Sequence, residues 1–432
     1  MRHRIANFTF RVSLLAVLLF FSFRSPLRGQ TQAPSAYAIT HAKIFTLTGA
    51  AIEDATVVIR DGKIAAVGAQ VEVPAGAQVI DAKGLQVYPG LFDAVTQMGL
   101  SEIAAVNATV DVAETGSYNP DVVAATAILP ASEHIPVTRA AGITEVIVTP
   151  GIGGFDFFGG GTVLIKKSIA MVINWPTIET RSFDFQTFSF KEKPYTEAKQ
   201  EYEKKVNELA DWLERVKHYA QVMQSPAAPR FDRDVKLEAL GPVVRGDLPV
   251  LVRAARARDI RNAVEFCDLH SLKMILAGGA EAYKVKDLLR SKRVPVVLGP
   301  TLRLPEEEDD AYDRPMTQPA ELAAAGVKFA FASFDNSFAR RLGQQAANAV
   351  AYGLPYEEAL KAVTLYPAQI FGISDQVGTI EPGKIANLVV TNGDPLELTT
   401  DVRYLFIKGQ LTSTDNRHKQ LYEKYLNRPK AQ

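Results

Sequence analysis

Alternating apolar and polar residues mark two regions near opposite ends of the chain. The first covers residues 37–86 and contains "ATVVIRDGKIAAVG", in which two alternating runs flank Asp61 and Gly62. An Asp-Gly pair between two such runs favours a β-hairpin with a two-residue turn. The second region covers residues 378–413. We expect the two regions to meet and to build one small β domain from both ends of the chain.

The middle of the chain has a different pattern, in which short and almost wholly apolar runs alternate with helical segments. Strands that are apolar on both faces, each followed by a helix, are typical of a parallel sheet covered by helices. A middle of this length suits an α/β fold of the TIM (β/α)8 barrel type. A doubly wound open sheet is the alternative. The apolar runs are 143–151, 248–254, 273–279, 294–300 and 327–333.

The first 30 residues resemble a secretory signal peptide. Arg2, Arg4 and Arg11 precede the apolar run "VSLLAVLLFFSF", which is too short to cross a bilayer as a helix. We therefore expect export to the periplasm or the outside of the cell, with cleavage after Gly29 or Ala33. An uncleaved membrane anchor is the alternative. After cleavage we expect no stable membrane insertion.

Composition and charge narrow the function classes. The chain is 47% apolar and 22% charged, which is typical of a globular protein. Residues 1–30 contain five arginines and no acid, so their removal changes the formal charge from 0 to −5. A mildly acidic protein is not expected to bind nucleic acid. Cys267 is the only cysteine, which excludes an intrachain disulfide, and its helical context predicts packed core.

Two motifs resemble those of the metal-dependent amidohydrolase superfamily, with imidazolonepropionase and dihydroorotase as examples. They are "VIDAKGLQVYPGLFDA" near the start and "ALKAVTLYPAQIFGISDQVGTIEPGKIANLVVTNGDPL" near the end. The resemblance implies a barrel at residues 87–374 and a composite β-sandwich from residues 36–86 and 375–413. Residues 1–30 are then the signal peptide and residues 414–432 a C-terminal tail.

The same resemblance implies hydrolysis of amide or cyclic amide bonds by water that zinc activates. Residue by residue, however, the expected histidines are missing. Val95 and Gln97 occupy the positions of the first histidine pair, Arg253 occupies that of a later histidine, and Ala277 or Gly278 that of another. Zinc sites require at least three protein ligands, mostly imidazole or thiolate. We therefore expect a divergent member without a metal or other cofactor.

Other polar and aromatic residues remain candidates for the mouth of the barrel. Asp335 is the candidate catalytic base. It lies near the position of the family's last aspartate, but it is shifted from that position by one residue. Arg253 could pair with Asp335 or bind a substrate carboxylate. The glycine-rich segment 149–166 is expected either to cover a ligand or to fill the mouth. The candidate substrate-binding residues are Gln97, Arg253, Asp156, Phe157 and Asn336.

Two hypotheses of function follow. One is a secreted hydrolase of non-peptide C–N bonds that is catalytically degenerate. The other is a non-catalytic pseudoenzyme that binds a ligand or partners an active paralogue. The sequence is compatible with a small-molecule ligand and with an oligomer of this chain alone or with a related amidohydrolase.

Overall fold

The computed structural model describes residues 36–149, 151, 164–166, 169–184, 187–224 and 233–428. Among the helices of these residues, none is long and apolar enough to cross a membrane. The predicted signal peptide lies outside the described residues, so it stays a prediction.

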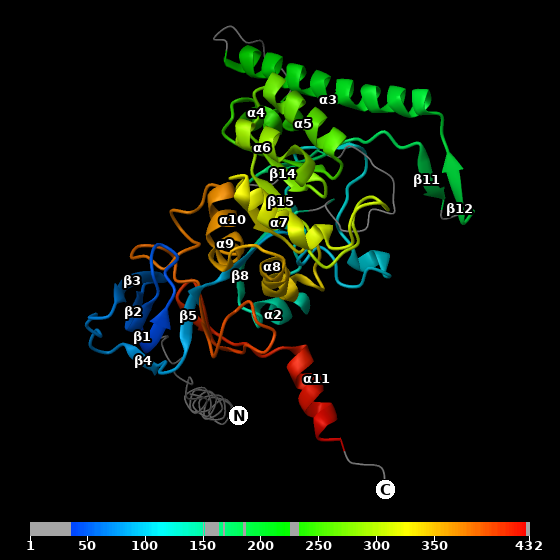
Figure 1. Ribbon diagram of the computed structural model, residues 1–432. Helices are drawn as coiled ribbons and strands as arrows, with labels where there is room; N and C mark the ends of the chain where they lie inside the picture. The colour runs from blue at the N-terminus through cyan, green and yellow to red at the C-terminus, as the bar shows by residue number, and fades with distance from the viewer. Residues whose placement is uncertain are drawn as a thin grey trace, which may run out of the picture.

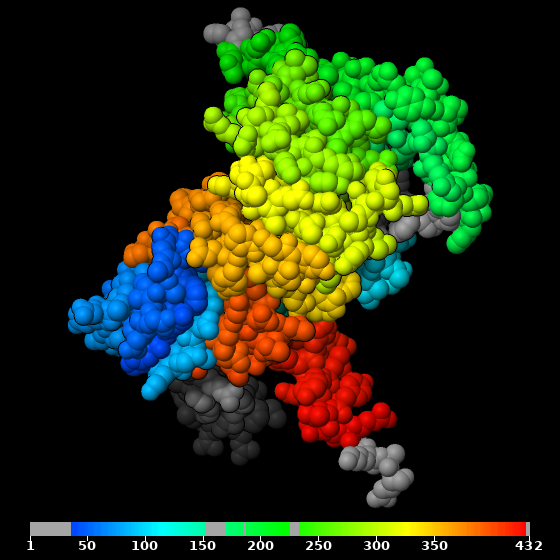
Figure 2. All heavy atoms as spheres, viewed as in Figure 1, coloured from blue at the N-terminus to red at the C-terminus, as the bar shows by residue number. Residues whose placement is uncertain are grey.

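One sheet contains strands from both ends of the chain. Its order is β19-β18-β17-β5-β1-β2-β3, with β4 paired to β1. The two ends are joined where β17 pairs antiparallel with β5, with Val389 opposite Tyr88. Figure 2 shows the blue N-terminal strands packed beside the orange C-terminal segment. The strands are β1 (Ala36–Ile44), β2 (Ile52–Arg60), β3 (Lys63–Gly68), β4 (Gln78–Asp81), β5 (Gln86–Pro89), β17 (Leu388–Thr391), β18 (Val402–Ile407) and β19 (Gln410–Thr412).

The predicted hairpin is present in this sheet. β2 and β3 pair antiparallel, with Arg60 opposite Lys63. Asp61 and Gly62 have φ of 51° and 77°, the left-handed conformation that a tight two-residue turn requires. Strands from both chain ends therefore lie in one sheet, whereas the composite β-sandwich domain stays a prediction.

The middle of the chain contains mostly parallel strands. A seven-stranded sheet has the order β16-β15-β14-β13-β10-β9-β7, and β6 pairs separately with β8. The end of β16 meets β6, because Phe334 N–H donates to the carbonyl of Val95 at 2.9 Å. The strands are β6 (Leu91–Thr96), β7 (Tyr118–Asn119), β8 (Ile143–Val148), β9 (Leu164–Lys166), β10 (Met171–Asn174), β13 (Val250–Ala254), β14 (Met274–Gly278), β15 (Val296–Leu298) and β16 (Phe329–Phe331).

These pairings show a mixed α/β fold. A single buried cluster also joins side chains from β6, β10, β13, β14, β15 and β16, as the interior of a barrel would require. The described strands do not by themselves close into a ring of eight, so the closed (β/α)8 barrel stays a prediction.

Helices cover the strands and form the other side of the larger core (Figure 1). The long α3 and the β11–β12 hairpin project from the body, and α11 extends from the opposite end. Residues 195–223 contain opposite charges at spacings of three and four, a pattern that predicts a helix. The structure confirms it as α3, with Leu209, Leu213 and Val216 buried. The helices are α2 (His134–Arg139), α3 (Tyr195–Gln224), α4 (Val235–Val244), α5 (Ala257–Leu269), α6 (Lys286–Lys292), α7 (Arg314–Ala324), α8 (Leu342–Ala351), α9 (Tyr356–Ala362), α10 (Leu365–Ile370) and α11 (Arg417–Leu426); β11 is Arg181–Asp184 and β12 is Ser189–Glu192.

Candidate functional site

The candidate site lies where the parallel strands end. The carboxyl ends of parallel strands meet at one edge of a sheet, and in barrels the loops that follow them build the site. The last residues of seven strands lie at this edge, which we call the mouth. These strands are β6, β8, β10, β13, β14, β15 and β16.

The positions expected to hold metal ligands lie at or next to the mouth. Val95 is fully buried in the interior cluster, and Gln97 follows β6 and is half-buried. Arg253 lies on β13 between Asn174 of β10 and Ala277 of β14, which are its register partners. The strand pairing therefore places an arginine and an alanine side by side where histidines were expected.

Asp335 is fixed by its own loop. Its Oδ1 accepts the backbone N–H of Phe338 at 2.7 Å. Its backbone carbonyl accepts a hydrogen bond from the hydroxyl of Thr96 at 2.6 Å and lies 2.8 Å from the hydroxyl oxygen of Ser333. One oxygen of the carboxylate therefore stabilises the turn before η4 (Ala339–Arg341). The assignment of Asp335 as a base stays a prediction.

A buried carboxylate, Asp93 of β6, lies behind this loop. Its two oxygens accept hydrogen bonds from Ser333, one from the backbone N–H at 2.9 Å and one from the hydroxyl at 2.5 Å. Asp93 is fully buried. Burial raises the pKa of Asp93 to about 7, although the two hydrogen bonds from Ser333 oppose the rise. Ser333 cannot be identified as this partner from the sequence, because no local pattern indicates a contact between residues 240 positions apart.

Asn336 connects two loops at the mouth. It is 8% exposed, and its side-chain amide donates to the backbone carbonyl of Ser101, in the segment after β6. Its side-chain oxygen accepts the hydroxyl of Ser337 at 3.2 Å. These bonds give Asn336 a structural role, and its predicted contact with a substrate is untested. Asp156 and Phe157 lie outside the described residues.

A second arginine, Arg303, lies near Arg253. Burial lowers the pKa of Arg303, Glu306 opposes this, and the positive charge of Arg253 lowers the pKa further. Arg303 Nη2 lies 3.6 Å from Glu306 Oε2, and Arg256 Nε lies 3.3 Å from Glu307 Oε1. The acidic segment 305–313 is thus partly held by arginines, and the mouth contains two cations close enough to interact.

Two buried oxygens at neighbouring strand ends lack a hydrogen-bond partner among the described residues. They are Oγ1 of Thr149, directly after β8, and Oδ1 of Asn174, at the end of β10. Both residues are otherwise held: the N–H of Thr149 donates to Thr96 O at 2.9 Å, and the Asn174 amide donates to Gly151 O at 3.1 Å. An unpartnered buried acceptor is costly, so each oxygen is a candidate ligand contact.

The described residues at the mouth offer few donors of the kind that zinc prefers. Within the described ranges, no three His, Cys, Asp or Glu side chains are close enough together to hold a metal ion. The histidine at the start of α2, His134, has its Nε2 3.0 Å from the backbone carbonyl oxygen of Glu102. The charge of Arg253 would in addition repel a divalent ion at this edge.

Comparison with known proteins gives consistent results. The sequence model of the amidohydrolase family matches residues 255–414. Amidohydrolase tasK of Hapsidospora irregularis is 24% identical over 374 residues, which are 78% of this chain and 37% of that protein. N-acetylglucosamine-6-phosphate deacetylase of Haemophilus influenzae is 52% identical over 44 residues, 10% of this chain and 12% of that protein. The chain thus matches well under half of the length of either relative.

Among solved structures, an amidohydrolase from Thermotoga maritima MSB8 is similar with a TM-score of 0.73 and 26% identity. The match covers 88% of this chain and all of that one. Residues 255–414 therefore match the amidohydrolase family, and the chain as a whole resembles amidohydrolase superfamily proteins in sequence and in fold.

Proposed function

We propose that this chain is an exported amidohydrolase-superfamily protein that no longer carries out zinc-dependent hydrolysis of C–N bonds and instead binds a small organic molecule at the mouth. The family match at 255–414 supports the hydrolase ancestry. The residues at the strand ends support the loss of the metal chemistry. We propose no cofactor for it.

The observation that carries this proposal is the pairing of Arg253 with Ala277 at the ends of β13 and β14. An alanine methyl group cannot coordinate a metal, and a guanidinium group stays protonated at any physiological pH. Val95 is equally unable to coordinate, and Gln97 offers one weak oxygen. Without a bound metal, water keeps a pKa far above neutrality and attacks amides slowly.

Ligand binding is supported by the polar groups that remain. The unpartnered oxygens of Thr149 and Asn174 would accept hydrogen bonds from N–H or O–H groups of a ligand. The positive charge of Arg253 favours a ligand with an anionic group, whereas Arg303 already pairs with Glu306. We propose a polar, acidic small molecule as the ligand class.

Metal analysis tests the proposal directly. The full chain is incubated with zinc, passed through gel filtration and analysed by mass spectrometry of the elements, beside a zinc amidohydrolase treated in the same way. We expect far less than one zinc per chain and no hydrolysis of a panel of cyclic and linear amides. Retention of stoichiometric zinc would contradict the proposal.

A second candidate is metal-independent hydrolysis of an activated amide with Asp335 as the base. The likeness to an amidohydrolase over the full length of that chain favours it. A lone general base contributes about 10²–10⁴-fold to the rate, which suits only reactive substrates. Activity that survives a chelator and disappears in Asp335→Asn would support this candidate.

Export and assembly are separate proposals. The run of apolar residues 12–23 supports a cleaved signal peptide. A mass measurement on protein from the periplasm or medium should show loss of the first 29–33 residues.

Light scattering of the chain, by itself and mixed with a related amidohydrolase, tests whether it forms the predicted homo- or hetero-oligomer.

A further inference from the structure

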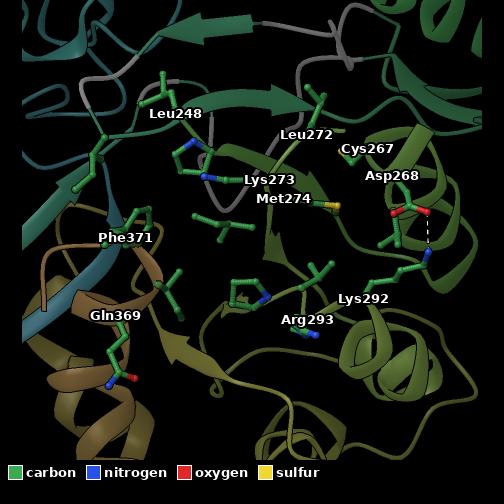
Figure 3. Close-up of a pocket in the computed structure, with 18 of the residues that line it drawn as sticks. Leu248, Cys267, Asp268, Leu272, Lys273, Met274, Lys292, Arg293, Gln369 and Phe371 are labelled. Atoms are coloured by element: carbon green, nitrogen blue, oxygen red, sulfur yellow. Dashed lines mark hydrogen bonds and ion pairs between the residues drawn. The ribbon is translucent and has the colours of Figure 1, made fainter. Parts of the chain in front are cut away.

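A cavity lies at the end of the barrel region opposite the mouth. Its volume is about 690 Å³, within the range of small-molecule sites. Its lining residues come directly before β10, β13, β14 and β15 or at their first positions, and from α5 and α10. Figure 3 shows Cys267 and Asp268 on one wall and Gln369 and Phe371 on the other. The cavity is thus separate from the candidate site.

The walls of the cavity combine apolar and charged side chains. Met274 and Leu272 are 7% and 8% exposed, and Phe371 is 4% exposed. Cys267 lines the cavity from α5 and is 2% exposed. Burial raises the pKa of this thiol to about 12, so it is protonated and behaves as a small apolar group. The remaining apolar lining residues are Ile169, Leu248, Pro249, Val264, Ile275, Val294, Pro295 and Ile370.

The charged residues of the cavity leave an excess of positive charge. Asp268 pairs with Lys292 at 2.6 Å (Figure 3), and Asp247 pairs with Arg245 at 2.8 Å. Both acids of the lining are thereby neutralised. Lys273 and Arg293 also line the cavity, and neither has an ion-pair partner among the described residues. Both side chains are exposed, which places them at the rim.

We propose that this cavity binds an amphiphilic monocarboxylate, such as a medium-chain fatty acid. The aliphatic body would lie against Met274, Leu272 and Phe371. The carboxylate would lie at the rim, where Lys273 and Arg293 donate to it. The apolar wall favours burial of a hydrocarbon chain, and the uncompensated cations select an anion over a neutral or cationic head group.

The choice of head group makes the proposal testable. Isothermal titration calorimetry on the full chain measures the affinity for decanoate, which we expect to bind saturably. Decanol and decyltrimethylammonium, which keep the hydrocarbon chain but change the head group, should bind at least tenfold more weakly.

Variants of the two basic residues at the rim separate recognition of the carboxylate from hydrophobic binding of the hydrocarbon chain. Lys273→Gln and Arg293→Gln should each weaken decanoate binding about tenfold, since hydrogen bonds to charged groups are the stronger class. Lys83→Gln changes an exposed lysine in the turn between β4 and β5, and it should leave the affinity unchanged. Equal affinity for decanoate and decanol, or no saturable binding of decanoate by calorimetry, would overturn the proposal. Neither outcome affects the zinc test at the mouth.

Discussion

At the scale of single residues, the contact between Asp93 and Ser333 is the most informative. Asp93 was visible in the sequence as an acid at the end of an apolar motif, but its partner was not. Local patterns carry no information on which distant loop meets a strand. The same limit hid Thr149, Asn174 and Arg303. Val95 and Gln97, in contrast, directly follow a recognisable motif, and Arg253 lies near the end of an apolar run that predicts a strand.

The pKa of Asp93 leads to a pH dependence of stability. Asp93 has a pKa of about 7 in the folded chain and a reference value of 3.8. The folded state therefore binds the proton of Asp93 more tightly than the unfolded state does. The contribution of this group to the free energy of unfolding is consequently largest below pH 4. That contribution is lost as the pH rises through 7. At roughly 1.4 kcal/mol per pKa unit, the change is at most about 4 kcal/mol.

We predict that Asp93→Asn flattens this dependence. An asparagine copies the protonated acid, because its oxygen can accept the Ser333 N–H and its amide can donate to the Ser333 hydroxyl. Urea unfolding at pH 5 and pH 8 should show a smaller difference in the free energy of unfolding than in the wild type. Asp61→Asn, at an exposed turn carboxylate, is the control. An unchanged pH slope in Asp93→Asn would contradict this interpretation.

Glu145 of β8 also contributes to the pH dependence of the free energy of unfolding, in the same direction as Asp93. Burial raises its pKa to about 7, against hydrogen bonds from Thr144 and from Asn387, whose side-chain amide donates at 2.7 Å. Asn387 also accepts the backbone N–H of Lys408 at 2.6 Å. The residual slope in Asp93→Asn should therefore come largely from Glu145.

At the scale of elements, the turn at 61–62, the helix at 195–223 and the strand–helix order from 248 to 351 could be predicted. Each depends on local periodicity. The β11–β12 hairpin and the antiparallel pairing of β9 with β10 were not predicted. Short strands of exposed residues have no distinctive pattern, and strand direction depends on long-range contacts.

One close approach between elements is specific enough to test. Gly90 lies between β5 and β6, and its N–H donates to Asn387 O at 2.9 Å. A Cβ placed there would lie 2.7 Å from both Cβ and Cγ2 of Thr144. We predict that Gly90→Ala destabilises the fold by about 1–3 kcal/mol or more, through overpacking of buried groups.

Circular dichroism during thermal unfolding would measure the effect. Gly49→Ala is the matched control, because a Cβ at Gly49 meets no atom within 4 Å. If both substitutions had the same melting temperature, the close packing of β5, β6 and β8 would be wrong.

At the scale of the whole molecule, the two chain ends depend on each other. Leu405 and Phe406 of β18 are fully buried, whereas no residue of α11 is buried. The predicted tail at 414–432 therefore contains a helix with little contact to the rest of the protein.

We predict that deleting residues 417–432 changes the free energy of unfolding by less than about 0.5 kcal/mol, as expected for exposed surface. Deleting residues 402–432 removes β18 and β19 and should abolish cooperative unfolding. Urea titrations of both truncated proteins, followed by tryptophan fluorescence, measure this. Equal stability of the two truncations would show that the last strands contribute nothing to the core.

The pairing of β5 with β17 also constrains the order of events during synthesis. β5 leaves the ribosome early, but its neighbour emerges only when nearly the whole chain has been made. Until then one edge of β5 has open hydrogen-bonding groups, which can pair with other chains and cause aggregation. The order of synthesis therefore leaves this edge of β5 unpaired until almost the last residues of the chain are made.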